Sequence, residues 1–219
     1  MTDSGAARTA AAAAPASVEG AAAASADRDA ALWAETLKQL ANVVAHDLRN
    51  ALNAVAVNLE VVRGRSARGA DASAIAPFAA TAADHFEIAA AAAEALLGFA
   101  RPEPGRVDVA AVVARLIRLL AVGGRERLRL TDRSDGMAIT VAPPDIARVA
   151  VARSVLGALG TAASGEEVAC EITADDGIFL RVVCPPHVPP LPDSQVVTVA
   201  AANGIRFVSR EQSLELRFP

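Results

Sequence analysis

The sequence predicts an α+β protein in which a long helical hairpin precedes a small α/β sandwich, and three observations support this prediction. Apolar residues recur at steps of three and four over residues 29–64, the spacing of one face of a helix. Proline and glycine then interrupt the helical pattern at residues 101–105. Beyond this linker, two alternating apolar segments flank Asp175-Asp176-Gly177, a strong β-hairpin signal.

The composition excludes several classes of protein. The chain has 219 residues, a net charge of −4 and 53% hydrophobic residues, about half of which are alanine. Alanine favours helix, and this length suffices for one or two small domains. The mild acidity argues against nucleic-acid binding, which usually needs a basic stripe. No charge-free apolar run reaches membrane-spanning length and no leucine-rich secretory signal begins the chain, so we expect a cytoplasmic protein without membrane contact.

The first hundred residues divide into a tail and two helices. Residues 1–28 are small and polar, and we expect a disordered tail there. Residues 29–100 form the predicted helical hairpin, with a turn at RGRSARGA and a second helix from about Asp71 to Phe99. Such a hairpin cannot shield its own apolar stripe, so we expect two copies to pair as a homodimer with a four-helix bundle. The stripe consists of Leu37, Leu40, Val44, Leu48, Leu52, Val55, Leu59 and Val62.

Residues 107–219 read as the mixed α/β domain, because short helical patterns alternate there with short strands. Cys170 and Cys184 are expected to be small core residues of this domain. A segment rich in proline, residues 185–192, cannot form a regular element. The expected helices are 108–122, beginning at an Asp108 cap, 143–163 with proline in its first turn, and 194–202; the expected strands are 128–130, 138–141, 168–173, 178–183, 205–209 and 213–218.

The first helix carries the most informative group of polar residues. His46 lies on the face away from the apolar stripe, and Asn50 lies one turn further along the same face. A solvated imidazole has a free ring nitrogen near neutral pH and is a competent nucleophile toward phosphorus. The adjacent Asp47 could orient the ring or accept its proton. A solvated helix surface that happens to contain histidine explains the same spacing, so the spacing alone leaves both interpretations open.

The string HDLRNALNAV, which begins at His46, resembles the H-box of two-component histidine kinases. The resemblance implies that His46 is the phospho-acceptor and that Asp47 assists its imidazole. It places Arg49 beside the phosphoryl group, and Asn50 at the position that orients water for dephosphorylation of a partner in related proteins. Ala51 departs from the family, which usually has proline there, so the kink of the helix is expected to be lost rather than its chemistry.

The resemblance continues beyond the H-box. Residues 96–104, LLGFARPEP, are similar to the end of the family's second helix and its linker, and residues 107–109 are similar to the start of its ATP-binding domain. The order of the expected elements also matches this family from about residue 30 to residue 219. The resemblance is specific in the first helix and at the linker, and topological elsewhere.

The ATP-binding motifs of that family are missing. The helix 143–163 contains no asparagine for Mg²⁺, and the best alignment places Leu156 or Gly157 at that position. The segment expected to read Asp-x-Gly-x-Gly reads instead as residues 183–188, VCPPHV, and no glycine-rich lid precedes Gly204. A nucleotide triphosphate needs a metal ligand and backbone donors. We therefore expect a degenerate ATPase-like domain with no cofactor-binding residues, no metal ligands and no autokinase activity.

A retained acceptor histidine beside a lost ATP site is most similar to the dimeric, kinase-derived histidine phosphotransferases. The resemblance implies that phosphoryl groups pass between receiver domains of response regulators through His46, with Mg²⁺ supplied by the receiver. A histidine kinase is a second candidate partner. Three alternatives stay open: an inactive scaffold that binds receivers or kinases, a receiver phosphatase in which Asn50 positions water, and a residual kinase.

Overall fold

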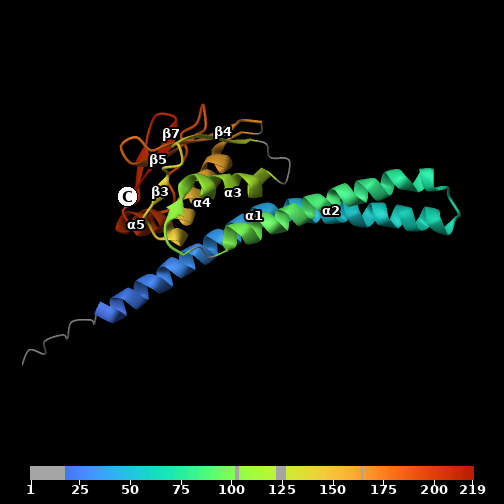
Figure 1. Cartoon of the computed structure of the whole chain (residues 1–219), viewed down its shortest axis with the longest axis horizontal. Helices are drawn as coiled ribbons and strands as arrows, with labels where there is room; N and C mark the ends of the chain where they lie inside the picture. The colour runs from blue at the N-terminus through green and yellow to red at the C-terminus, as the bar shows by residue number, and fades with distance from the viewer. Residues whose placement is uncertain (1–17, 102–103, 122–126, 164) are drawn as a thin grey trace, which may run out of the picture.

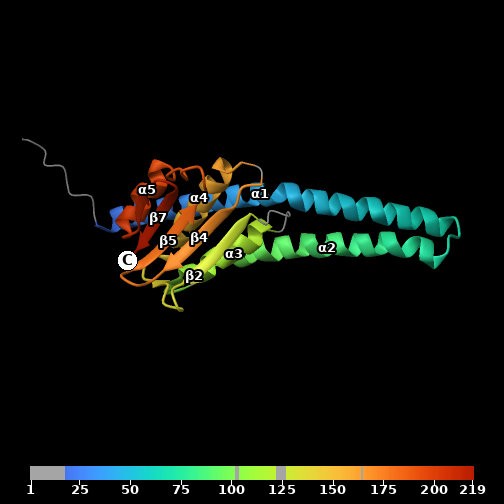
Figure 2. The ribbon, with the colours of Figure 1, turned by 90° about the horizontal axis from the view of Figure 1, so that it is seen from above.

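The computed structural model describes residues 18–101, 104–121, 127–163 and 165–219, and it confirms the α+β class. Helix α1 (Val18–Ala67) and helix α2 (Ala72–Ala100) form a long antiparallel hairpin, and the α/β domain lies beside its base (Figures 1 and 2). The expectation of a disordered tail is wrong for residues 18–28, which are helical. Their alanine content favours helix even without an apolar stripe. Residues 1–17 of that tail lie outside the described residues.

The hairpin is closed by buried apolar residues on facing sides of its helices, most of them alanine. On α1, Leu40, Val44 and Ala51 are buried, and α2 contributes Ala89 and Ala92. Alanine allows two helix backbones to approach closely, so a tight contact forms with few large side chains. In the outer half of the predicted stripe, Leu52 and Leu59 stay exposed within one chain, whereas Val55 and Val62 are partly buried.

The turn of the hairpin is held by Arg65. Its Nη1 donates a hydrogen bond of 2.8 Å to the carbonyl of Ala74, and its guanidinium lies 4.5 Å from the centroid of the Phe78 ring. These contacts join the last turn of α1 to the first turns of α2 and explain why part of the arginine-rich turn is structural.

The second domain is a mixed sheet with helices against one face (Figure 1). The five-stranded sheet has the order β2-β4-β5-β7-β6, in which β2 and β4 are parallel and the other neighbours are antiparallel. Its helices are α3 (Val109–Ala121), α4 (Pro144–Thr161) and α5 (Ser194–Ala202), and its strands are β2 (Leu128–Arg133), β4 (Val168–Thr173), β5 (Ile178–Val183), β6 (Arg206–Ser209) and β7 (Ser213–Phe218).

The predicted strand at 138–141 belongs elsewhere. Only Ile139–Thr140 are extended, as β3, and they pair with β1 (Val107–Asp108) in a separate two-stranded sheet. This pairing connects the linker to the start of α3, where the Asp108 carboxylate accepts hydrogen bonds from the amides of Ala110 and Ala111. The predicted cap at Asp108 is therefore confirmed.

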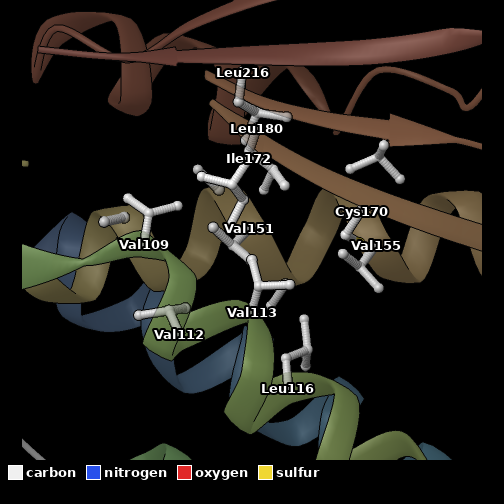
Figure 3. Packing of buried hydrophobic residues seen from close by; sticks show 14 of the residues in the cluster. Val109, Val112, Val113, Leu116, Val151, Val155, Cys170, Ile172, Leu180 and Leu216 are labelled. Atoms are coloured by element: carbon white, nitrogen blue, oxygen red, sulfur yellow. The ribbon is translucent and has the colours of Figure 1, made fainter. Parts of the chain in front are cut away.

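The core of the α/β domain lies between α3, α4 and the sheet. Figure 3 shows Val151 of α4 between Val113 of α3 and Ile172 of the sheet, and Leu116 of α3 and Leu180 of the sheet belong to the same buried cluster. Both cysteines are free and buried, as expected, and burial raises the pKa of the Cys170 thiol to about 12. Within the described residues, no helix combines the length and apolar character needed to cross a membrane.

Candidate functional site

The candidate site is a group of three side chains on one turn of α1. The Nδ1 atom of His46 lies 3.2 Å from the Oδ1 atom of Asp47 and 3.2 Å from the Nδ2 atom of Asn50. Because α1 is continuous through this segment, the spacing of four residues fixes the contact between His46 and Asn50. The prediction that these residues share one face is confirmed.

His46 and Asp47 differ sharply in exposure. The side chain of His46 is 71% exposed, whereas that of Asp47 is only 17% exposed. Asp47 lies between the buried positions Val44 and Ala51 along the helix, at the edge of the face that packs in the hairpin. The carboxylate therefore holds the imidazole from the protein side, and the ring projects into solvent.

The two contacts of the ring meet at the same nitrogen, and this determines what the other nitrogen can do. If Nδ1 carries the proton, it donates to the Asp47 carboxylate; if Nδ1 is unprotonated, it accepts from the Asn50 amide. The first tautomer leaves the lone pair of Nε2 available for attack on an electrophile. A carboxylate at Nδ1 also stabilises the positive charge that develops on the ring when Nε2 forms a bond.

Arg49 is the fourth residue that the H-box resemblance places at the site. It is exposed on the same stretch of α1, and among the described residues no hydrogen bond joins it to the His46 ring. Asn53, which extends the polar strip, is exposed as well. The structure thus joins His46, Asp47 and Asn50 by contacts, and leaves Arg49 as a neighbouring surface cation.

A cleft between α2 and α3 is a feature that sequence reasoning missed. It has a volume of about 490 Å³, and the α2 residues that line it include Ala91, Ala95 and Gly98, whose small side chains do not fill it. Glu94 on α2 and Arg115 on α3 are among its charged residues, together with Arg118. Because α1 and α2 run antiparallel from a turn near residue 69, this part of α2 lies level with His46 along the hairpin. No local sequence pattern reveals it, since it requires α3 to dock on α2.

The position where the resembled family would carry its Mg²⁺-binding asparagine is closed by packing. The two candidates for this position are Leu156 and Gly157, and Gly157 on α4 lies against the proline-rich segment, where an added Cβ atom would be 3.3 Å from Cγ of Pro190. A longer side chain at this position would have to displace Pro190. Among the described residues, no group of three or more His, Cys, Asp and Glu side chains is arranged to hold a metal ion.

Comparisons with known proteins give structural neighbours only. No family model matches this sequence, and no curated protein matches it significantly. Among solved structures, the chain is similar to a bacterial phosphotransferase, with 14% identity, a TM-score of 0.41, and coverage of 84% of this chain and 95% of that chain. It is also similar to the histidine kinase domain of a blue-light-activated histidine kinase from Erythrobacter litoralis, with 14% identity, a TM-score of 0.39, and coverage of 85% and 95%. Both likenesses are coarse, so the functional argument rests on the residues of α1.

Proposed function

We propose that this protein is a histidine phosphotransferase of a phosphorelay, which passes a phosphoryl group between receiver domains of response regulators through His46. The observation that carries the proposal is the exposed imidazole whose Nδ1 contacts both Asp47 and Asn50. Such a ring is accessible to a macromolecular phosphodonor and is oriented by its own helix. The H-box string around His46 supports the same role.

In the first step, the Nε2 lone pair of neutral His46 attacks the phosphorus of an aspartyl phosphate on the donor receiver. An N–P bond forms as the P–O bond to the aspartyl carboxylate breaks, and the carboxylate leaves with the electron pair. The proton stays on Nδ1, where the Asp47 carboxylate stabilises the resulting imidazolium. Transfer of this kind depends on alignment of the two reacting groups more than on covalent assistance.

In the second step, the aspartate of another receiver attacks the phosphorus, and the electrons of the N–P bond return to Nε2. A Mg²⁺ ion in the acidic pocket of the receiver would neutralise charge on the phosphoryl oxygens. This chain contributes the nucleophile, the orienting carboxylate of Asp47 and a rigid helix. A cytoplasmic location, where response regulators act, belongs to the same proposal.

The proposal includes independence from ATP. The missing nucleotide motifs support it, and so does the packing of Pro190 against Gly157, one of the two residues aligned with the family's asparagine. The phosphoryl group therefore comes from a phosphorylated partner, and a receiver or a histidine kinase could supply it.

We also propose that the working form is a homodimer with a four-helix bundle. On the described hairpin, the side chains of Leu52, Leu59 and Phe86 are 47%, 52% and 60% exposed, respectively. Large apolar side chains left exposed along one long hairpin favour an interaction surface. A second hairpin packed against them would complete the bundle.

A phosphotransfer experiment tests the function directly. A receiver labelled with radioactive phosphate on its aspartate is mixed with this protein, and label on the protein is measured after rapid quenching. The wild type should acquire label and His46→Gln should not, whereas His85→Gln, a control histidine on α2, should behave as the wild type. If no receiver from the same organism transfers label to the wild type, the proposal is wrong, and loss of label from the receiver without transfer would indicate a phosphatase.

A further inference from the structure

The first part of α1 extends beyond the end of α2, and there the α/β domain takes the place of α2 (Figures 1 and 2). Its contacts with α4 and α5 form a junction that includes a buried guanidinium. Arg148 on α4 is only 1% exposed, and its Nη1 donates a hydrogen bond of 2.8 Å to the carbonyl of Arg101, just after α2. Its guanidinium carbon lies 5.7 Å from the centroid of the Trp33 ring on α1.

Trp33 continues this set of contacts to α2. Its ring centroid lies 5.8 Å from that of Phe99, the buried aromatic residue in the last turn of α2. One arginine and one aromatic pair therefore tie together α1, the end of α2 and α4. A guanidinium removed from water needs hydrogen bonds and charge contacts. Its ion pair with Asp145, at 3.8 Å, lies within α4, whereas its contacts with Arg101 and Trp33 exist only in this arrangement of the three helices and favour it.

A second polar contact crosses the same junction. Thr36 on α1 is fully buried, and its hydroxyl donates a hydrogen bond of 2.9 Å to the carbonyl of Leu32. The same oxygen accepts a hydrogen bond of 3.0 Å from Nε of Arg153 on α4. Both functions of the hydroxyl are thus used, and the second one exists only while α4 lies against α1.

Apolar packing surrounds these polar contacts. Leu32 on α1, Val149 on α4 and Val196 on α5 form a buried cluster, against which Trp33 and Phe207 are packed. Separation of the α/β domain from α1 would expose all of these side chains to water. Domains connected by a polar contact usually move relative to each other, but an apolar interface with buried hydrogen bonds opposes that motion.

We infer that this junction holds the α/β domain in one fixed orientation on the hairpin, and that Arg148 is a positioning residue for phosphotransfer. The fixed orientation keeps α3 packed against α2. The cleft between these two helices, which Arg118 lines, then stays level with His46 along the hairpin. The α/β domain then forms a permanent part of the surface that a receiver meets, rather than a mobile unit. The effect on phosphotransfer rests on the proposed function, whereas the fixed orientation does not.

The orientation is tested by a distance measurement in the full chain. Spin labels are attached to Ser66→Cys at the tip of the hairpin and Thr198→Cys on α5, both exposed positions, while the native cysteines are buried. The labelled protein is diluted with an excess of unlabelled protein, so that in a dimer a labelled copy has an unlabelled partner. Double electron–electron resonance should give one narrow distance distribution for the otherwise unsubstituted chain. A broad distribution there would overturn the inference.

Substitutions at the junction should broaden that distribution. Arg148→Met keeps the volume of the side chain but removes its hydrogen bonds, and Thr36→Val is a milder, nearly isosteric change that removes the acceptor for Arg153. Arg129→Met, at an exposed arginine paired with Glu167 on the sheet, is the matched control and should leave the distribution narrow. If both junction variants fold, as judged by circular dichroism, and keep the narrow distribution, the inference is wrong; if Arg148→Met does not fold, Thr36→Val decides alone.

The chain contains a single tryptophan, so fluorescence reports on the junction directly. Trp33 emission should shift to longer wavelength, and acrylamide should quench it more strongly, in Thr36→Val than in the Arg129→Met control. Unchanged emission together with an unchanged distance distribution would contradict the inference.

The positioning role is tested with two phosphodonors. Transfer from a phosphorylated receiver to His46 should fall about tenfold or more in Arg148→Met, because misplacement of a docking surface lowers the rate of an aligned transfer. Phosphorylation of His46 by phosphoramidate, a small donor that needs no docking surface, should stay unchanged. Equal loss with both donors would refute positioning. If the wild type accepts no phosphoryl group from any receiver, the proposed function fails, and the distance measurement still decides the orientation.

Discussion

Substitution of Asp47 by asparagine tests the chemistry of the site most sharply. The change keeps the size of the side chain and removes its charge, so the imidazolium formed during transfer loses a charge-assisted contact of 3.2 Å. A hydrogen bond to a charged group contributes about 1.5–3 kcal/mol. Because the His46 side chain is 71% exposed, solvent screening reduces this to about 1–2 kcal/mol. Transfer should therefore be about 5- to 30-fold slower in Asp47→Asn.

The assay is rapid-quench phosphotransfer from a labelled receiver. The receiver is in excess, so that the measured rate is that at which His46 acquires the phosphoryl group. Asp84→Asn is the matched control, since Asp84 is an exposed aspartate beside His85 on α2 and should have no effect. Circular dichroism excludes unfolding of either variant. A transfer rate for Asp47→Asn within about twofold of the wild type would refute the argument that this carboxylate stabilises the reacting ring.

Four further outcomes are expected. Asn50→Ala should retain label on His46, because the attacking nitrogen is untouched; slower hydrolysis of phosphorylated receiver in this variant would instead indicate the phosphatase in which Asn50 positions water. Leu52→Glu combined with Leu59→Glu should reduce the mass in light scattering from that of a dimer to the 22.3 kDa of one chain, because charge replaces the exposed apolar surface. Cys170 should resist thiol reagents at pH 8 until the protein unfolds. Its pKa is raised from 9.0 to about 12 by burial, so its contribution to stability should be complete below pH 9 and lost as the pH rises toward 12, measured by denaturant unfolding. A fluorescent ATP analogue should show no saturable binding, and saturable binding would indicate a residual nucleotide site.

Local patterns predicted most of the helices and strands. The period of the apolar residues predicted the hairpin, and Asp175-Asp176-Gly177 predicted the turn between β4 and β5. The first ten or so residues of α1 were missed because alanine carries no periodic signal. Leu32 and Trp33, which follow these residues in α1, pack against α4 and α5, and no local pattern shows this packing. The pairing of β1 with β3 was missed for the same reason, because it depends on segments that are distant in sequence.

The site divides in the same way. The contact between His46 and Asn50 follows from helical spacing alone, and so does the exposure of the ring. The low exposure of Asp47 depends on how the hairpin packs, and the sequence did not indicate it. The junction around Arg148 includes a hydrogen bond between residues 117 positions apart, and the cleft exists only because α3 docks on α2. Both arise from tertiary packing, so they required the structure.

The exposure of His46 has a further consequence for the lifetime of a phosphorylated form. A phosphoramidate on this ring would stand in bulk water, because the described part of the site consists of side chains on one convex helix and has no covering wall. Exclusion of water from the reacting group would then come from the docked receiver and end when the receiver leaves. Under the proposed function, the phosphorylated protein is a short-lived carrier between encounters, and the abundance of the accepting receiver decides how much phosphate is lost to hydrolysis.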